Sequence, residues 1–586
     1  MCGIFALVNA NINDITDSYL ENIHNSCNKG KPRGPEYSTF NTDYLLNYKT
    51  ILGFHRLAIN GLDSISNQPI FINNVIIICN GEIYNFKQLY QELGLTSKDI
   101  ATNSDCEVII HMYLKYGMEY TLQQLDGVFA FVLFDFTNAE EPVFFVGRDP
   151  YGVRPLFKSA EAWEPGPVFA SEMKQLVDIK YTGWASPLIT QFEPSTFETY
   201  AFRKYSDTTK RWFKKSVTKY VTFSFYKQPD LKLDQYGIDY YLFGIRTTFI
   251  NAVKKRVENC ERPIACLLSG GLDSSLVTSI VSKLYHSRIE TYSIGLRGSE
   301  DLKYAKKVAN FLGTKHTEII ITEEEFFYTI PEVIKVIESY DTTTVRASVG
   351  NYLVAKYISE NSEAKVIFNG DGSDELMGGY LYFNAAPDNM SFDKECKRLL
   401  KNIHYFDVLR SDRCISSNGL EPRTPFLDRG WVEHYLSIPI HIRNHNNKEC
   451  SKNGIYIEKQ LIRMAFDMKN NSAIIPEKYN PTYKEFLPAE ILYRKKEAFS
   501  DGVSSKSRSW YQIIQEQVEK IPDDLIFNNE LPAEYCKPIT KEQKYYYYLF
   551  HLNYCKTRPR NIIPYYWMPK FIEATDASAR TLSIYK

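Results

Sequence analysis

The sequence lacks the features of a secreted, metal-clustered or membrane-spanning protein. Its 11 cysteines are an odd number among 586 residues, with no C-x-x-C pair and no metal-type cysteine and histidine spacing. No signal-peptide pattern and no apolar run long enough to cross a bilayer is present. These absences argue against a disulfide framework and predict a cytoplasmic protein with reduced thiols. Several cysteines are expected to pack as small buried groups, namely Cys27, Cys79, Cys106, Cys260 and Cys266.

An excess of charge of either sign is also missing. Lys and Arg number 69 against 70 for Asp and Glu, which gives a net charge of −1. Without a global basic field, neither a nucleic-acid nor a membrane partner is expected. A local cluster of Lys and Arg over 204–219 is expected to be solvated surface. The length predicts two large domains, or three to four smaller units.

What the sequence does contain begins with Met1-Cys2-Gly3-Ile4-Phe5. Met1 precedes a small residue and is expected to be removed, which would put a thiol and a free α-amine on Cys2. The ordinary pKa values of these two groups are about 8.5 and about 7.7–8. A nucleophile and a base close to working pH would then share one residue. On these residues alone, Cys2 could equally be just a small second residue.

The first third of the chain predicts layers of β-sheet with helices packed outside. A helix is expected to begin at Ser104-Asp105-Cys106-Glu107, with Ser104 or Asp105 as its N-cap. The other predicted elements are strands over 1–8, 51–59, 75–79, 128–135 and 143–148 and a helix over 86–92.

Polar residues interrupt the apolar pattern at the ends of these strands. Arg56 is suited to a bidentate grip on a substrate carboxylate, and Glu82 and Asp105 to a substrate ammonium. The Asn80 amide and the Gly81 backbone N–H could stabilise an oxyanion. Each has an ordinary alternative, because Asn80-Gly81 is also a common hairpin turn and Arg56 could form a structural ion pair.

Six motifs in order (CGIF, RGPE, HRLAI, NGEIYN, SDCE and GRDPYGVRPLF) resemble the N-terminal-nucleophile glutamine amidotransferase domain over about the first 200 residues. The resemblance implies an αββα layered sandwich of antiparallel sheets, in which Cys2 attacks the glutamine amide and Asn80 and Gly81 form the oxyanion hole. This sequence departs from the family at Pro32 and Glu36, where the family usually has His and Asp. The implied glutamine-binding residues are Arg56, Leu57, Ala58, Ile59, Asn60, Asn80, Gly81, Glu82 and Asp105.

The middle of the chain carries an anion-binding pattern. After an irregular linker near 197–233, a helix is expected over 239–257, a buried strand over 263–268 and a helix over 276–284. The strand and the last helix flank Ser269-Gly270-Gly271-Leu272-Asp273-Ser274-Ser275, which would present backbone N–H groups and a helix dipole to an anion. The loop lacks the Walker lysine. S-G-G-x-D-S is instead a signature of enzymes that cleave ATP between its α and β phosphates, although a plain connecting turn is the alternative.

Further strands over 291–296, 317–321 and 365–368 alternate with helices, which predicts a doubly wound parallel α/β domain. Ligands bind such sheets at the carboxyl ends of the strands. One of these ends carries Asn369-Gly370-Asp371-Gly372-Ser373-Asp374-Glu375. Asp273 and Asp374 could there hold Mg²⁺ against pyrophosphate oxygens.

Three more motifs, YDTTTVRAS, PFLD and RKKEAFSDG, extend the resemblance to the glutamine-hydrolysing asparagine synthetase family, from Met1 to about Val503. It implies aspartate and intermediate contacts from Thr343 and Arg346, and catalytic roles for Asp371 and Lys496. Asn369 and Asp371 stand where the family typically has Ser and Glu. The implied ATP-binding residues are Leu268, Ser269, Gly270, Gly271, Asp273, Ser274, Ile294, Asn369 and Gly370.

The implied ligase activity amidates aspartate with ammonia from glutamine, through a β-aspartyl-AMP intermediate and an internal passage between two sites. The expected division is a glutaminase domain over 2–200, a linker over 201–230, a synthetase domain over 231–525 and a tail over 526–586 without chemical signature, expected to be helical with a loosely ordered end. A homodimer is compatible with this division of the chain. Two alternatives stay open: an amidoligase acting on another carboxylate, and a catalytically inactive glutamine sensor or assembly protein.

Overall fold

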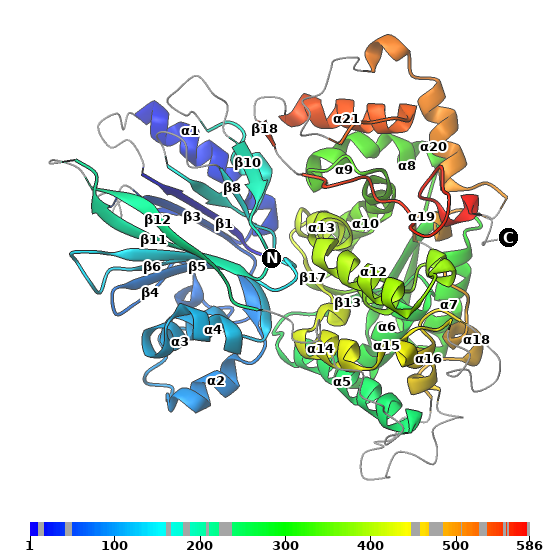
Figure 1. Cartoon of the computed structure of the whole chain (residues 1–586), viewed down its shortest axis with the longest axis horizontal. Helices are drawn as coiled ribbons and strands as arrows, with labels where there is room; N and C mark the ends of the chain where they lie inside the picture. The colour runs from blue at the N-terminus through cyan, green and yellow to red at the C-terminus, as the bar shows by residue number, and fades with distance from the viewer. Residues whose placement is uncertain are drawn as a thin grey trace.

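The computed structural model comprises two halves that lie side by side (Figure 1). Two stacked antiparallel sheets form most of the N-terminal half, and a parallel sheet surrounded by helices forms the C-terminal half. The structure describes residues 1–9, 17–41, 48, 50–159, 166–179, 188–206, 210–221, 237–446, 457–467, 485–497, 499–505, 507–526, 536–554, 558–559 and 562–582.

The first sheet has seven strands in the order β18-β10-β8-β9-β1-β3-β2. Near its centre, β1 pairs antiparallel with β3 and β9. At the edge, β18 from the C-terminal segment pairs parallel with β10, so both ends of the chain join one sheet. The strands are β1 (Gly3–Val8), β2 (Tyr37–Asn41), β3 (Thr50–Arg56), β8 (Phe157–Ser159), β9 (Val168–Ala170), β10 (Leu188–Gln191) and β18 (Arg558–Pro559).

The second sheet has six antiparallel strands in the order β12-β11-β7-β6-β5-β4. Its strand β5 runs without a break through Asn80, Gly81 and Glu82, which pair with β6. The hairpin-turn alternative for Asn80-Gly81 is therefore wrong, and β5 is longer than predicted. The strands are β4 (Ile70–Ile72), β5 (Val75–Ile83), β6 (Gly127–Asp135), β7 (Val143–Arg148), β11 (Thr196–Lys204) and β12 (Lys210–Lys219).

Strand alternation builds the predicted four-layer sandwich. Ile4 and Ala6 of β1 pack between the two sheets, whereas Phe5 and Leu7 point to the other face and pack against α1. On the outer face of the second sheet, alternate residues of β5 and β6 pack against α2, α3 and α4. The αββα expectation is confirmed (Figure 1). The helices are α1 (Asp17–Asn28), α2 (Phe86–Leu93), α3 (Val108–Tyr116) and α4 (Met118–Gln124).

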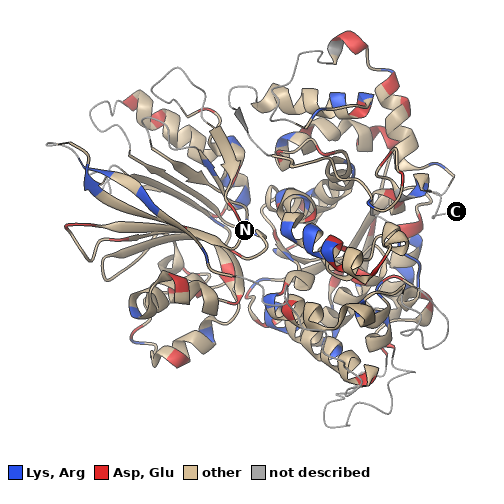
Figure 2. Ribbon diagram, in the orientation of Figure 1, with Lys and Arg blue, Asp and Glu red and all other residues tan. Residues whose placement is uncertain are grey.

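The prediction of an irregular linker over 197–233 is wrong over 197–204 and 210–219, which are strands. The hairpin of β11 and β12 occupies 196–204 and 210–219, because its alternating aromatic residues pack into the sandwich. The Lys residues of β12 are exposed, as expected for solvated surface, and Figure 2 marks the Lys and Arg positions of this strand in blue. Residues 207–209 and 222–236 lie outside the described residues, and the predicted domain limits stay predictions.

The C-terminal half contains a five-stranded parallel sheet in the order β15-β14-β13-β16-β17. Ile264 and Cys266 of β13 pack toward α5 and α6, whereas Ala265 between them packs toward α10. Helices thus cover both faces, which confirms the doubly wound prediction. The elements are β13 (Ile264–Leu267), β14 (Glu290–Leu296), β15 (Lys315–Ile321), β16 (Val366–Phe368), β17 (Glu421–Arg423), α5 (Ile238–Glu258), α6 (Leu272–Leu284), α7 (Glu300–Leu312) and α10 (Thr342–Asn361).

The tail is more ordered than expected over its described residues. Helix α21 (Lys541–Tyr554) buries aromatic side chains against α20 (Trp510–Glu519) and the rest of the domain, and Trp567 is only 6% exposed. The loosely ordered end that we predicted is therefore wrong as far as Leu582, and residues 583–586 lie outside the described part. Among the described helices, none is both long and apolar enough to cross a bilayer.

Candidate functional site

Cys2 directly precedes β1, and both its backbone and its thiol are held there. Its backbone N–H donates to Asn80 Oδ1 at 3.1 Å, and its Sγ donates to the Leu57 carbonyl at 3.8 Å. Met1 precedes it and is buried, with its ammonium 3.9 Å from Glu421 Oε2. Burial raises the pKa of the Cys2 thiol to about 11. Near neutral pH this thiol needs a base, which the predicted removal of Met1 would supply as a free α-amine.

The side-chain amide of Asn80 has one end in use and one end available. Its Oδ1 accepts the Cys2 N–H, whereas its Nδ2 is buried and has no hydrogen-bond partner in the described part of the chain. An unpaired buried donor costs about 1–3 kcal/mol, so a ligand oxygen would be favoured here. At Gly81 a Cβ atom would lie 2.7 Å from Val128 O, so only glycine lets β5 pass β6 this closely. This arrangement fits the predicted oxyanion hole.

Arg56 ends β3, which is therefore shorter than the strand predicted to residue 59. Its buried guanidinium donates to the Asp63 carbonyl at 2.8 Å, to Asn67 Oδ1 at 2.7 Å, to the Asn60 carbonyl at 3.4 Å and to the Gly61 carbonyl. All these acceptors are neutral. No ion pair among the described residues involves Arg56, so the structural ion-pair alternative finds no support there. The positive charge is free to bind a carboxylate.

Glu82 and Asp105 are buried acids near the same loop. Glu82 Oε2 accepts from Asn60 Nδ2 at 2.6 Å and pairs with Arg423 Nη2 at 3.2 Å. Burial, with nearby acids, raises the pKa of Glu82 well above its usual range. Asp105 Oδ2 accepts the Ile83 N–H at 2.6 Å, and burial raises the pKa of Asp105 to about 7. An ammonium ligand would stabilise the charged form of both acids.

The RGPE motif connects the nucleophile to the other half of the protein. Arg33 Nε donates to the Cys2 carbonyl at 2.9 Å, and its Nη1 pairs with Asp412 Oδ1 at 2.8 Å. Glu36 uses both oxygens: Oε2 accepts the Ala58 N–H at 2.7 Å, and Oε1 pairs with Arg262 at 2.9 Å. The predicted glutamine loop is thus fixed between the halves, and the longer Glu36 side chain spans this contact.

The second candidate site is a cavity of about 180 Å³ at the carboxyl ends of the parallel strands. The loop after β13 forms one wall and leads into the N-terminus of α6, four residues earlier than predicted. Ser269 and Ser274 close this loop with a hydroxyl–hydroxyl bond of 2.9 Å. Gly270 does not line the cavity. Its φ is +71°, and a Cβ there would lie 2.4 Å from the Ala305 backbone of α7, so its glycine is required by packing.

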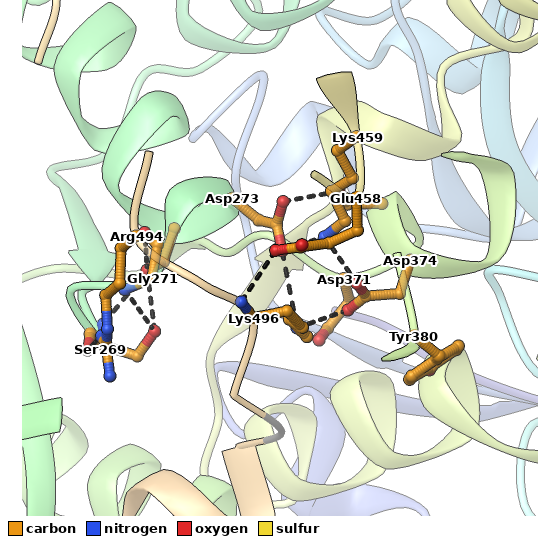
Figure 3. A network of polar contacts seen from close by, with 12 residues as sticks. Ser269, Gly271, Asp273, Asp371, Asp374, Tyr380, Glu458, Lys459, Arg494 and Lys496 are labelled. Carbon is orange, nitrogen blue, oxygen red and sulfur yellow. Dashed lines mark hydrogen bonds and ion pairs between the residues drawn. The ribbon is translucent and has the colours of Figure 1, made fainter. Parts of the chain in front are cut away.

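Two lysines join the two predicted metal-binding carboxylates (Figure 3). Lys459 Nζ lies 2.6 Å from Asp273 Oδ2 and 2.5 Å from Asp374 Oδ1. Lys496 Nζ lies 2.6 Å from Asp374 Oδ2 and 3.7 Å from Asp273 Oδ2. Burial acts to raise the pKa of Asp374, but Lys459 and Lys496 together lower it to about 2. We call these four side chains the Lys–Asp cluster. When a phosphate binds, the two lysines of this cluster can pair with its oxygens in place of the carboxylates, so their positive charges stay paired with negative ones.

Asp371, three residues before Asp374, also lines the cavity. Its Oδ1 pairs with Arg410 Nη2 at 3.0 Å, and its backbone N–H donates to Asn369 Oδ1 at 3.3 Å. Burial raises the pKa of Asp371 above its usual range. The Thr343 hydroxyl, near the start of α10, is buried and has no partner in the described part of the chain. In this loop, the two residues that depart from the apparent family, Asn369 and Asp371, are therefore hydrogen-bonded to each other.

Comparisons with known proteins agree with this geometry. A family model described as a glutamine amidotransferase domain matches residues 1–229, and one described as asparagine synthase matches 244–395 and 386–545, more than half of the chain. The asparagine synthetase [glutamine-hydrolyzing] of Gallus gallus is 40% identical over 100% of this chain and 99% of its own length. The chain belongs to the glutamine-hydrolysing asparagine synthetase family.

Other members of the glutamine-hydrolysing asparagine synthetase family are similarly close. Those of Rattus norvegicus and Homo sapiens are 40% and 39% identical, and each alignment covers 100% of this chain and 99% of the relative. Among solved structures, the NH3-dependent NAD synthetase of Campylobacter jejuni aligns at 20% identity with 28% of this chain and 74% of its own, at a TM-score of 0.18. That score is too low to support an argument.

The structure brings together most residues that the asparagine synthetase resemblance assigned to ATP and aspartate. Arg346 is an exception, because it does not line the cavity. It is buried and pairs with Glu542 and Asp576 of the C-terminal segment, at 2.6 and 2.7 Å. The predicted residues that line the cavity are Leu268, Ser269, Gly271, Asp273, Ser274, Ile294, Thr343, Asn369, Gly370, Asp371, Asp374 and Lys496.

Sequence reasoning missed several side chains of this cavity. Lys459 belongs to no motif, and Tyr380 and Arg410 lie between motifs, in stretches for which no element was predicted. A search for cations beyond the motifs could not have ranked Lys459 among 69 Lys and Arg residues. The expected packing of cysteines holds for Cys27, Cys79, Cys106 and Cys266, which are buried, whereas Cys260 is half-buried. All nine described cysteines are free thiols.

Proposed function

We propose that this chain is an asparagine synthetase that amidates aspartate with ammonia released from glutamine. One observation carries the proposal: a thiol beside an unpaired amide donor in one half, and a Lys–Asp cluster beside an anion-binding loop in the other. The first suits amide hydrolysis and the second suits cleavage of ATP to AMP and pyrophosphate. Family membership supports pairing the two chemistries in one protein.

In the glutaminase half, Cys2 Sγ attacks the side-chain amide carbon of glutamine. The α-amine of Cys2, free after removal of Met1, takes the thiol proton and passes it to the leaving ammonia. Asn80 Nδ2 and the Gly81 N–H stabilise the oxyanion. Arg56 binds the substrate carboxylate throughout. Loss of ammonia leaves a thioester on Cys2, which water hydrolyses to glutamate and the free thiol.

Two observations support the assignment of the substrate α-groups. Arg56 is a buried cation whose protein partners in the described residues are all neutral acceptors, so a carboxylate would neutralise it. Asp105 and Glu82 are buried acids with raised pKa values, so an ammonium would compensate their charge. Free amino acids carry both groups. Leu57, Ala58 and Ile59 form the loop between Arg56 and Asn60, whose amide donates to Glu82.

In the synthetase half, a carboxylate oxygen of aspartate attacks the α-phosphorus of ATP, giving β-aspartyl-AMP and pyrophosphate. Lys459 and Lys496 stabilise the negative charge that accumulates on the leaving pyrophosphate. The loop of Ser269, Gly271 and Ser274 with the N-terminus of α6 binds its oxygens. Ammonia then attacks the activated carbonyl, and AMP leaves.

Thr343 and Asp371 fit the aspartate end of the cavity. The Thr343 hydroxyl is a buried group with no protein partner in the described residues, so it is available to a substrate. Asp371 is fixed by Arg410 and by the Asn369 amide. Through this second contact, Asn369 would compensate for the shorter acid at position 371.

Mg²⁺ fits the Lys–Asp cluster on the chemistry of its donors. Asp273 and Asp374 offer hard carboxylate oxygens, which Mg²⁺ prefers, and each is already placed by two lysines. Mg²⁺ bound with ATP would neutralise phosphate charge there. The described residues contain no group of three or more His, Cys, Asp or Glu placed to hold a metal ion, so phosphate oxygens would complete its ligands.

The passage for ammonia, the cytoplasmic location and the homodimer stay predictions of the sequence. Apolar packing supports the passage, because Leu57, Ile59 and Val153 of the first half belong to the same buried cluster as the core of the second. An apolar path would keep ammonia unprotonated.

One assay tests the proposal. Purified protein with ATP, Mg²⁺ and glutamine is given single carboxylic acids, and pyrophosphate and the amide product are measured. Aspartate alone should give pyrophosphate and asparagine in equal amounts. Another acid in its place would favour the alternative amidoligase, and no pyrophosphate with any acid would favour a non-catalytic glutamine sensor.

A further inference from the structure

The C-terminal segment over 562–582, which we call the C-terminal strap, is part of the synthetase cavity. It follows β18 and runs back across the helices of the second half, where Figure 1 draws it in red near α19 (Phe499–Gly502). The cavity is otherwise lined by residues between 267 and 497 and by Ser500, and the strap adds Trp567 to them. A tail without sequence motif thus supplies a wall of the site.

The indole of Trp567 lies beside the aspartate end of the cavity. Its ring is 5.1 Å from that of Tyr380 and belongs to the same buried cluster as Phe406. The Tyr380 hydroxyl in turn donates to Glu375 Oε1, in the short helix α11 (Ser373–Met377) that follows Asp371. Trp567, Tyr380 and Phe406 all line the cavity, so together they form an aromatic wall next to Asp371.

The backbone of Trp567 fixes the helix that carries Thr343. Its N–H donates to Asp341 Oδ1 at 2.8 Å, in a buried contact. The other oxygen of Asp341 caps α10 and accepts the Thr344 N–H at 2.9 Å. The position of Thr343 therefore depends on a carboxylate that the strap holds in place.

Ion pairs and hydrogen bonds anchor the strap on the C-terminal side of Trp567. Asp576, together with Glu542 of α21, pairs with Arg346, one turn along α10 from Thr343. Further along, Ser578 Oγ donates to Asp501 Oδ1 at 2.7 Å, and Arg580 pairs with Glu497, the neighbour of Lys496. One segment thus contacts both α10 and the loop of Lys496.

We propose that Trp567 is a substrate-positioning residue whose indole closes the aspartate end of the synthetase cavity and shields the acyl-adenylate from water. The proposal rests on the proposed function. An open wall would let aspartate bind in misplaced poses and let water, rather than ammonia, attack the intermediate. Water attack returns aspartate and AMP, so pyrophosphate would be released without asparagine.

The test uses the full-length enzyme with Trp567→Ala, Trp567→Phe and Phe571→Ala. Trp567→Ala should raise the KM for aspartate and lower kcat/KM about tenfold, because it removes a wall of the aspartate pocket and a displacement of about 1 Å can cost about a hundredfold in rate. The KM for ATP should stay within about twofold, pyrophosphate should exceed asparagine, and glutaminase activity should be unchanged. Trp567→Phe keeps an aromatic wall and should restore equal amounts of the two products.

Phe571→Ala is the matched control. Phe571 lies in the same strap and packs near Tyr382 with the two rings tilted and their centres 6.2 Å apart, but it does not line the cavity. Equal changes in aspartate KM for Trp567→Ala and Phe571→Ala would overturn the proposal, because the strap would then act only through folding. A Trp567→Ala enzyme with parental KM and product ratio would also overturn it.

Two further outcomes are separable. If Trp567→Ala does not fold, Trp567→Leu replaces it, because leucine removes the aromatic ring but keeps an apolar side chain. An excess of pyrophosphate over asparagine in this variant supports the proposal, and equal amounts overturn it. If the parent enzyme releases no pyrophosphate with aspartate, the proposed function fails. If the parent releases pyrophosphate with aspartate and the Trp567 variants behave like the parent, the inference about the strap fails while the proposed function stands.

Discussion

Replacing Lys459 with methionine tests the Lys–Asp cluster most directly. The side chain is 1% exposed, and its Nζ lies 2.6 and 2.5 Å from Asp273 and Asp374. Breaking a buried ion pair by removing one partner costs about 3–5 kcal/mol of stability. Here Lys496 still pairs with Asp374, so we expect a loss of about 3 kcal/mol, at the lower end of that range.

The effect on catalysis should be of similar size to the effect on folding, because 10²–10³ in rate corresponds to about 2.7–4 kcal/mol. Loss of one preorganised charge that stabilises developing negative charge costs about 10²–10³ in kcat. We therefore expect aspartate-dependent pyrophosphate release by Lys459→Met to fall about a hundredfold or more. Glutamine hydrolysis at Cys2 takes place in the other half and should persist. With one of its two cations gone, the pKa of Asp374 should also rise from about 2.

The assay measures pyrophosphate release, glutamate formation and thermal unfolding for each protein. Lys335→Met is a matched control, since Lys335 is 56% exposed and pairs only at the surface with Glu332. It should leave all three unchanged. Parental pyrophosphate release by a folded Lys459→Met protein would refute the reasoning, and Lys459 would then merely neutralise two buried acids.

Three further predictions concern the other assigned residues. Cys2→Ala should abolish glutamine hydrolysis but leave synthesis from added ammonium salt, and equal loss of both would contradict two separate sites. Asp371→Asn should lose aspartate-dependent pyrophosphate release, whereas Asp371→Glu should stay within about tenfold of the parent; parental asparagine synthesis by the Asn variant would make Asp371 a mere loop residue. Burial raises the pKa of Asp105 to about 7, so below that pH Asp105 is neutral and cannot pair with an ammonium. Glutamine binding to Cys2→Ala protein, measured by calorimetry, should weaken as pH falls through about 7, and a flat profile would rule out this role for Asp105.

The sequence alone determined the chemistry that lies in short, contiguous motifs. The loop over 269–275 was readable because a β-branched or apolar strand, a Gly/Ser turn and a helix follow one another within about 20 residues. The sandwich and the parallel sheet followed from strand periodicity and from the alternation of strands with helices. In each case the relevant interactions are local, or repeat with a fixed period along the chain.

Sequence reading failed where a residue's partner lies far along the chain. The segment near 197–233 read as irregular because polar Lys and Thr residues alternate with its aromatic ones, yet pairing with β7 makes β11 a strand. Arg346 was predicted to contact the substrate, but its guanidinium instead donates hydrogen bonds to Glu542, 196 residues away. No local pattern encodes such a pair.

Only the tertiary structure placed Lys459 between Asp273 and Asp374, and Trp567 in the cavity wall. Taken alone, a lysine without a motif and an aromatic residue in a tail are indistinguishable from surface and core residues. Their roles arise because folding buries charges that must be paired and apolar rings that must be packed, and the nearest partners in space need not be near in sequence.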